Sequence, residues 1–181
     1  MQVWIGVYLP HLSREVFQPN WSSTNEAASG MGLVVLDHDR VVALDQAAHE
    51  AGVRKGMRKG GVLTLAPDAH IHDKNELKEQ QAVTDVATAL MQFSPQVVIA
   101  EEQTVLVDVS ASLRLFGGVR ALRRAIRSSL AAFGFTVRTS VAPTGQGAWL
   151  MARYRGGLRL SIRSLMRQLP RLPALLVLEA R

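Results

Sequence analysis

The sequence predicts an α+β fold: a ferredoxin-like antiparallel sheet with helices on one face, and a small inserted subdomain. Three features favour this class: an apolar run near the amino end, two long segments with apolar residues at helical spacing, and an apolar hairpin pattern between them. The expected order of strand, helix, two strands, helix and strand is that of a ferredoxin-like unit. Residues 21–75 interrupt this order after the first strand and predict the insertion.

The first strand is expected over residues 3–9, VWIGVYL, which are apolar throughout and are followed by Pro10. An uninterrupted apolar run of strand length is typical of a strand that is buried on both faces. We therefore expect this strand at the centre of the sheet.

The insertion contains signals for two strands, a short helix and a basic loop. Apolar residues predict strands at 33–36 and 41–44, and residues 45–51 predict a helix that ends at Gly52. Residues 52–61 combine glycines with basic side chains, so we expect a positively charged loop rich in turns.

Two amphipathic helices flank the predicted hairpin. From about Asn75 the apolar residues recur at helical spacing, and a Ser-Pro pair after Phe93 ends that helix. Residues 97–109 predict a hairpin with a polar turn. Residues 119–133 predict the second helix, whose outer face is cationic.

A last strand and a third helix follow. Residues 135–142 predict the strand, and residues 143–147 predict a turn into a helix that runs to about Arg153. The turn contains Thr-Gly-Gln-Gly, which could suggest a phosphate loop, but it lacks the Gly-Lys-Ser/Thr ending that holds nucleotide phosphates. A helix-start turn is therefore favoured.

Charge is distributed unevenly along the chain. Residues 1–110 carry 8 basic and 14 acidic side chains, whereas residues 111–181 carry 13 arginines and a single carboxylate, Glu179. Arginine binds phosphate through a planar fork of donors, and a field of one sign attracts polyanions. Nucleic acid is the natural partner, although a GC-rich genome would also enrich arginine.

Composition excludes several classes of protein. With no cysteine, the chain has no disulfide framework, no thiolate zinc site and no cysteine nucleophile. No apolar run reaches the roughly 18 residues that cross a bilayer, and the amino end lacks a secretory signal. We expect a cytoplasmic protein without a membrane partner.

Four segments occur in an order and spacing that match one family: VWIGVYLPHL, VVALDQAAHEAGVRKGMRKG, FSPQVVIAEEQTVLVDVSASLRLFGG and VRTSVAPTGQGAWLMAR. Together they resemble the Y-family translesion DNA polymerases, and most closely the ImuB-type branch, which acts in bacterial damage-induced mutagenesis. The run SLRLFGG at residues 112–118 is the most diagnostic piece for that branch.

The resemblance implies a domain plan. It predicts a palm-like domain at residues 1–20 and 76–160, a fingers-like insertion at 21–75, and the start of a truncated thumb-like region at 161–181. Such relatives continue into a helix-hairpin-helix thumb, a little-finger domain and a clamp-binding tail, so we expect this chain to be a fragment or a truncated product. Implied partners are DNA, the sliding clamp, an ImuA-type RecA-like protein and an error-prone replicative-type polymerase.

Active members of the family hold two magnesium ions with carboxylates, which are the hard oxygen ligands that this ion requires. Two of these carboxylates stand at i and i+2 on the first palm strand, and an Asp-Glu pair stands at the facing hairpin turn. The resemblance places Val7 and Leu9 at the first pair and Gln103 and Thr104 at the second. It therefore implies a catalytically inactive homologue with no metal site and no cofactor.

The positions that bind the incoming nucleotide depart from the active pattern as well. Where active relatives hold the triphosphate with a Tyr and an Arg of the fingers and a Lys of the palm, this chain has Gln46, His49 and Gly145. Leu12 stands where a bulky ring normally excludes ribonucleotides. The resemblance thus implies that nucleotide binding is lost together with catalysis.

Alternatives remain at this stage. An active translesion polymerase with unusual ligands would need a shifted turn that brings in Glu101 and Glu102. A generic arginine-rich nucleic-acid-binding module would need no polymerase ancestry. His70 and His72 are spaced to share one face of a strand and could bind a metal, but no third ligand is evident nearby.

Two groups of basic residues are expected to contact DNA, one in the fingers-like loop and one near the thumb-like region: Arg54, Lys55, Arg58, Lys59, Arg153, Arg155, Arg159 and Arg163. A third group recurs at helical spacing opposite an apolar stripe: Arg120, Arg123, Arg124 and Arg127. This third group could meet phosphates. However, the family places this helix on the back of the palm, which favours a solvated helix surface.

Overall fold

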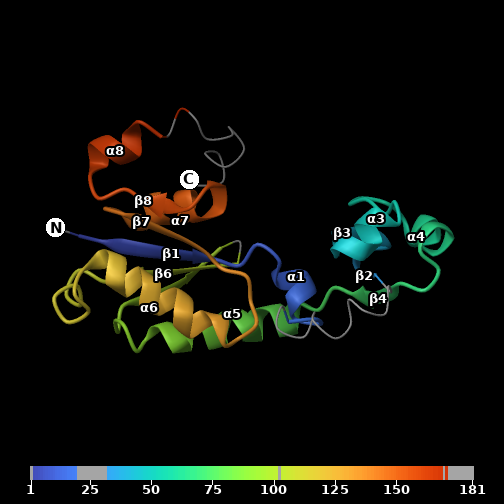
Figure 1. The fold of residues 1–181 in the computed structure, drawn as a ribbon, viewed down its shortest axis with the longest axis horizontal. Coiled ribbons are helices and arrows are strands. Elements are labelled where there is room, and N and C mark those ends of the chain that lie inside the picture. Colours follow the sequence, from blue (N-terminus) through green and yellow to red (C-terminus); the bar gives the residue numbers. More distant parts are fainter. Residues whose placement is uncertain (1, 20–31, 102, 169, 171–181) are drawn as a thin grey trace. The chain divides into compact units, whose positions relative to one another are not determined.

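The computed structural model describes residues 2–19, 32–101, 103–168 and 170. The chain divides into two compact units, one formed by residues 1–10 and 83–181 and the other by residues 11–82. Within the described residues, the first unit contains a five-stranded sheet and the second a three-stranded sheet (Figure 1).

The sheet of the first unit has the strand order β5-β6-β1-β7-β8. β1 lies at its centre, as the sequence predicts, and pairs antiparallel with both β6 and β7. β5 pairs antiparallel with β6, and the short β8 pairs parallel with β7. In sequence order the strands are β1 (Trp4–Tyr8), β5 (Val97–Ala100), β6 (Thr104–Asp108), β7 (Arg138–Ala142) and β8 (Gly157–Leu158).

Helices cover both faces of this sheet. The two long helices lie on one face, as predicted, and α7 packs against the other (Figure 1). Val83, Val86 and Leu90 of α5 and Leu122 and Ile126 of α6 are buried, which explains the apolar spacing in the sequence. The helices are α5 (Glu76–Leu90), of which residues 83–90 belong to this unit, α6 (Val119–Ala131), α7 (Gly145–Tyr154) and α8 (Ile162–Met166).

α7 approaches the sheet closely because Gly6 has no side chain. A Cβ atom at Gly6 would lie 2.6 Å from the carbonyl oxygen of Ala148 in α7. The hydroxyl of Ser140 on β7 donates to the same oxygen at 2.5 Å. Side chains alternate along a strand, so Ile5 and Val7 point to the opposite face, where both are fully buried.

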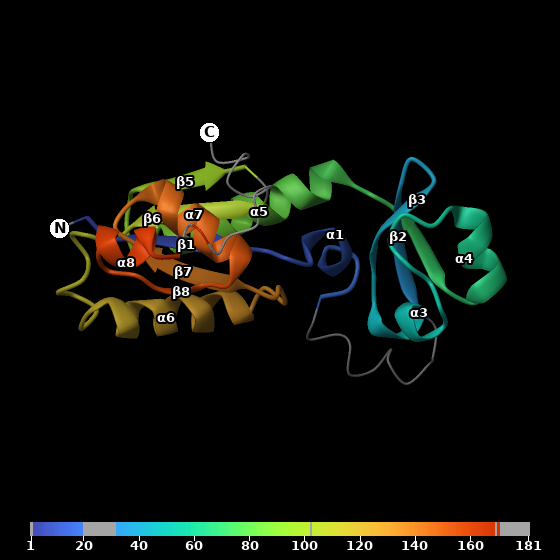
Figure 2. The same ribbon diagram turned by 90° about the horizontal axis from the view of Figure 1, so that it is seen from above.

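The second unit is built around a three-stranded sheet of order β3-β2-β4 (Figure 2). β2 pairs antiparallel with β3 and parallel with β4. Its apolar core consists of Val34, Leu36, Val41, Ala48, Val53 and Val62. The elements are α1 (Leu12–Glu15), β2 (Leu33–Asp37), β3 (Arg40–Leu44), α3 (Gln46–Glu50), α4 (Lys59–Leu65) and β4 (His70–Asp73).

The insertion departs from the sequence prediction at α4. The predicted basic loop at 52–61 ends early, because residues 59–61 form the first turn of this helix. Gly60 and Gly61 disfavour a helix, but Val62 is fully buried in the core of the unit, and this burial outweighs their propensity. The strands predicted at 33–36 and 41–44 and the helix at 45–51 are confirmed.

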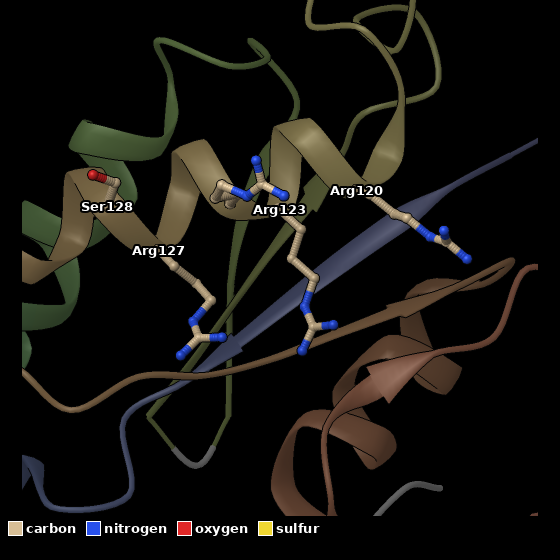
Figure 3. Close-up of a pocket in the computed structure, with 5 residues that line it drawn as sticks. Arg120, Arg123, Arg127 and Ser128 are labelled. Atoms are coloured by element: carbon tan, nitrogen blue, oxygen red, sulfur yellow. The ribbon is translucent and has the colours of Figure 1, made fainter.

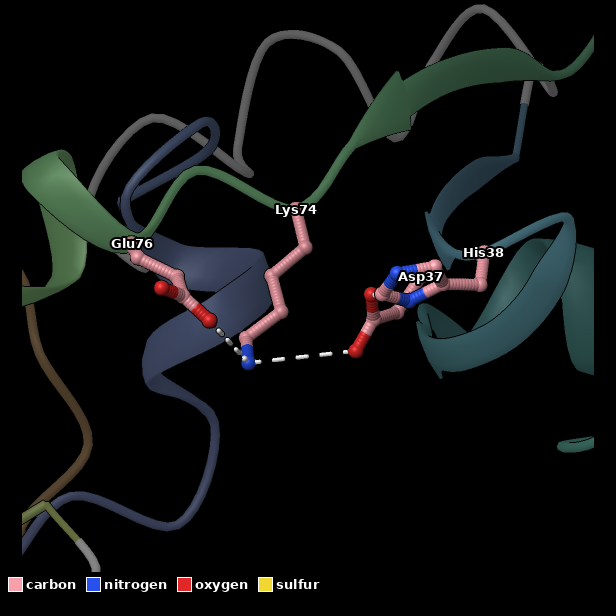
Figure 4. A network of polar contacts seen from close by, with 4 residues as sticks. All are labelled: Asp37, His38, Lys74 and Glu76. Carbon is pink, nitrogen blue, oxygen red and sulfur yellow. Dashed lines mark hydrogen bonds and ion pairs between the residues drawn. The ribbon is translucent and has the colours of Figure 1, made fainter.

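A small polar network ties the end of β2 to the start of α5 (Figure 4). The Lys74 ammonium lies 3.4 Å from a carboxylate oxygen of Glu76 and 3.9 Å from one of Asp37. Asp37 also contacts the His38 ring at 2.7 Å. These groups are partly or largely exposed, so the network contributes little to stability.

Of the helices in the described ranges, none is long and apolar enough to cross a bilayer. Most of the predicted thumb-like region, namely residue 169 and residues 171–181, lies outside the described residues, as do residues 20–31 and Glu102.

Candidate functional site

The four positions at which the family resemblance expects metal ligands lie next to one another at one end of the β1–β6 pair. Tyr8 is paired with Thr104 in the strand register, and Val7 is paired with Val105. The backbone N–H of Leu9 donates to the carbonyl of Gln103 at 3.1 Å. The structure therefore brings Val7 and Leu9 together with Gln103 and Thr104.

The chemistry of this junction is that of a hydrophobic core. Val7, Leu9 and Thr104 are all 0% exposed, and Gln103 is half-buried with a φ of 57° at the hairpin turn. Valine and leucine side chains carry no oxygen, and a divalent cation without oxygen ligands would lose its hydration without compensation. The side chains of Val7 and Leu9 thus offer no atom that a magnesium ion can bind.

The turn beside this junction is anchored to α7. The indole N–H of Trp149 donates to the carbonyl oxygen of Glu101 at 3.1 Å. The Glu101 side chain is exposed. Among the residues that the structure describes, no three His, Asp or Glu side chains gather closely enough to hold a metal ion.

The positions at which the family resemblance expects nucleotide-binding residues are divided between the two units. Leu12 in α1 is fully buried, whereas Gln46 and His49 are exposed on α3. Gly145 is the first residue of α7, in the other unit. Thr144 caps that helix by accepting from the backbone N–H of Gly147 at 3.1 Å, which confirms the predicted helix-start turn.

The fingers-like basic residues are exposed on the second unit: Arg54, Lys55, Arg58 and Lys59. Part of this charge is also used locally. One Arg54 nitrogen donates to the carbonyl oxygens of His49 at 2.7 Å and Val53 at 2.8 Å. This contact adds a second donor to the His49 carbonyl at the end of α3, which also accepts from the backbone N–H of Gly52.

The second predicted group extends from the last turn of α7 into α8. Arg155 and Arg163 are exposed, and Arg159 donates to the carbonyl of Leu158 at 2.8 Å. The guanidinium of Arg153 lies 4.7 Å from the centre of the Trp149 ring, a cation–π contact that packs it against its own helix. A contact of these side chains with DNA stays a prediction.

A structural role that the sequence did not reveal belongs to Arg138. Its Nε donates to the carbonyl of Ala152 at 2.6 Å, and its terminal nitrogens donate to the carbonyls of Arg153 and Tyr154. Carbonyls at the end of a helix lack partners within the helix. Arg138 therefore caps α7 from the neighbouring strand β7.

The arginines of α6 line an open hollow of about 450 Å³ (Figure 3). The lining residues are Arg120, Arg123, Arg124, Arg127 and Ser128. Arg123 reaches β7, where it donates to the hydroxyl of Thr139 at 2.8 Å and to its carbonyl at 3.1 Å. Burial, together with the charge of nearby Arg127, lowers the pKa of Arg123. The helical spacing of these arginines was the sequence signal for this cluster.

The model of the impB/mucB/samB family matches residues 22–153, which is well over half of the chain. This chain belongs to the impB/mucB/samB family. The predicted resemblance to the Y-family polymerases is thereby confirmed.

Individual proteins agree with this family assignment. Over 103 residues, the impB/mucB/samB chain is 28% identical to Protein ImuB of two Caulobacter vibrioides strains, which covers 57% of the chain and 22% of ImuB. It is also similar to the insertion ternary complex of Dbh DNA polymerase, with a TM-score of 0.69 and 20% identity over 95% of this chain and 52% of that one.

A DinB family error-prone DNA polymerase from Sulfolobus solfataricus has a TM-score of 0.66 and 20% identity, covering 99% of this chain and 54% of that one. The impB/mucB/samB chain thus spans about half the length of these solved polymerases and about a fifth of ImuB. These likenesses confirm the α+β fold class, and the family match identifies a protein related to translesion polymerases.

Proposed function

We propose that this chain is a catalytically inactive, polymerase-like accessory component of DNA-damage-induced mutagenesis. It binds primer-template DNA, and an error-prone polymerase of another chain carries out the synthesis. The observation that supports inactivity is the junction of β1 and β6, where Val7 and Leu9 are fully buried and apolar. Their alignment with the paired aspartates of active relatives is part of this proposal.

The physical reason is the requirement of phosphoryl transfer for two bridging metal ions. These ions neutralise the triphosphate and activate the attacking hydroxyl. Gln103 and Thr104, across from the first strand, contribute only neutral oxygens, which bind a divalent ion far less strongly than carboxylates do. Gln46, His49, Leu12 and Gly145 extend the same loss to nucleotide binding.

Binding to DNA would use the two predicted basic groups, one on each unit. In this proposal the sheet of β1 forms a palm over residues 1–20 and 76–160, and residues 21–75 form fingers. Residues 161–181 begin a thumb. The protein named ImuB among the relatives further suggests a role in recruitment, with the sliding clamp, an ImuA-type RecA-like protein and an error-prone replicative-type polymerase as partners.

A primer-extension assay tests this proposal. This chain is incubated with a labelled primer-template, all four deoxynucleoside triphosphates, and magnesium or manganese, beside an active Y-family polymerase as the positive control. We expect no extension by this chain. Template-dependent incorporation that disappears in Glu101→Ala or Glu102→Ala would instead establish an active polymerase with unusual ligands.

A further inference from the structure

The outer face of α6 concentrates positive charge more strongly than its role in the fold requires. Four arginines within eight residues line one hollow, and Arg120, Arg124 and Arg127 are exposed. Figure 3 shows the side chains of Arg120, Arg123 and Arg127 extending to the same side of the helix. The apolar face of α6, with Leu122, Ile126 and Leu130, already holds the helix on the sheet, so the three exposed arginines are not needed for packing.

The charges in this hollow are not balanced by any carboxylate among the described residues. In the part of the chain that the structure describes, no carboxylate lies within ion-pair distance of any of the four arginines. Arg123 is partly buried, and the charge of Arg127 acts on it. Repulsion between guanidinium groups raises the free energy of the empty site, and a bound anion would relieve it.

One of these arginines is held in place in advance. The two hydrogen bonds to Thr139 fix the Arg123 guanidinium against β7 and use two of its five donors. A guanidinium that is already ordered loses less conformational entropy when it binds a ligand. The exposed arginines on either side of Arg123 along α6 can then contact the same ligand.

The lining residues also indicate the class of ligand. Guanidinium forks match the geometry of phosphate oxygens, and the Ser128 hydroxyl adds a neutral donor. No aromatic side chain lines the hollow, so it has no platform on which bases could stack.

We propose that the α6 hollow binds the phosphate backbone of DNA, independently of its sequence. The hollow borders the segment that follows α7, because the Thr139 carbonyl that accepts from Arg123 would also lie 2.8 Å from a Cβ at Gly156. The inference concerns binding alone and does not depend on whether the chain is catalytically active.

The test compares two triple variants of the chain. The hollow variant, Arg120→Ala/Arg124→Ala/Arg127→Ala, removes the three exposed guanidinium groups. It keeps Arg123, which donates hydrogen bonds to Thr139 of β7. Its matched control, Lys78→Ala/Arg114→Ala/Arg167→Ala, removes the same charge from exposed positions outside the hollow. Affinity for a labelled oligothymidylate is measured by fluorescence anisotropy at several salt concentrations, after circular dichroism has shown that both variants are folded.

We expect the hollow variant to bind at least tenfold more weakly than the control. Three lost phosphate contacts to a single strand should also reduce the slope of log K against log salt by roughly 2. Equal affinities and slopes for the two variants would overturn the proposal, as would failure of the wild-type chain to bind at low salt. A polyglutamate peptide that displaces the oligonucleotide equally well at matched charge would also overturn it, because the hollow would then be a site for acidic protein.

Discussion

Replacing Gly6 with alanine tests the packing of α7 on the central strand. The added Cβ would lie 2.6 Å from the carbonyl oxygen of Ala148 and 2.9 Å from the hydroxyl of Ser140. An ordinary contact is 3.4–4 Å, so the α7 backbone must move by about 0.8 Å or more. That shift would also stretch the 2.5 Å hydrogen bond between Ser140 and Ala148.

The expected cost follows from these contacts. Overpacking of this kind costs about 1–3 kcal/mol, and loss of the hydrogen bond costs about 1 kcal/mol more. The smaller backbone entropy of alanine in the unfolded chain offsets about 0.4–1 kcal/mol of this cost. The net loss in unfolding free energy is therefore about 1–3.6 kcal/mol, which corresponds to a decrease in Tm of about 2–14 °C for a chain of this size.

The assay is urea unfolding followed by tryptophan fluorescence, because Trp4 and Trp149 both belong to this unit. The matched control is Gly145→Ala at the first residue of α7. The added Cβ would lie 3.7 Å from both Leu106 and Trp4. This control should be neutral or slightly stabilising. A Gly6→Ala protein as stable as the wild type would refute the described contact between α7 and β1.

Two further substitutions test polar contacts that should contribute differently to the free energy of unfolding. Arg138→Ala removes the donors to three carbonyls at the end of α7. It should lower the free energy of urea unfolding by about 2–3 kcal/mol, because hydrogen bonds to a charged group are stronger than neutral ones. Arg138→Lys, which has no planar fork of donors, should recover only part of that free energy. Lys74→Ala breaks the contacts with Asp37 and Glu76 and should cost less than about 1 kcal/mol, with the remaining effect decreasing further at high salt.

The elements that the sequence predicted best are those with a strong hydrophobic period. α6 is the clearest case, because Leu122, Ile126 and Leu130 recur along one face and all three are fully buried. β1 could be predicted equally well, because its unbroken apolar run is typical of a strand that is covered on both faces.

The elements that the sequence did not reveal depend on tertiary contacts. β4 has the sequence His-Ile-His-Asp, with a single apolar residue, and it is a strand because it pairs with β2. β8 has only two residues and exists through its pairing with β7. Neither segment is long enough to produce a hydrophobic period.

The candidate sites were likewise predictable only in part from the sequence. Residue identities alone suggested that Val7 and Leu9 cannot bind a metal, and the strand register places Thr104 beside them. The sequence could place the α6 arginines on one face, but it could not show that Arg123 is anchored to Thr139, because side-chain contacts across elements follow from packing. The role of Arg138 at the end of α7 was hidden for the same reason.

The most direct test of the central claim asks whether divalent cations bind at the junction of β1 and β6. In amide NMR spectra of the 15N-labelled chain, manganese is titrated together with a deoxynucleoside triphosphate, and paramagnetic broadening is mapped along the sequence. We predict that the amides of Val7, Leu9 and Thr104 keep their intensity at manganese concentrations that saturate an active Y-family polymerase. Selective broadening centred on these three amides would contradict the account.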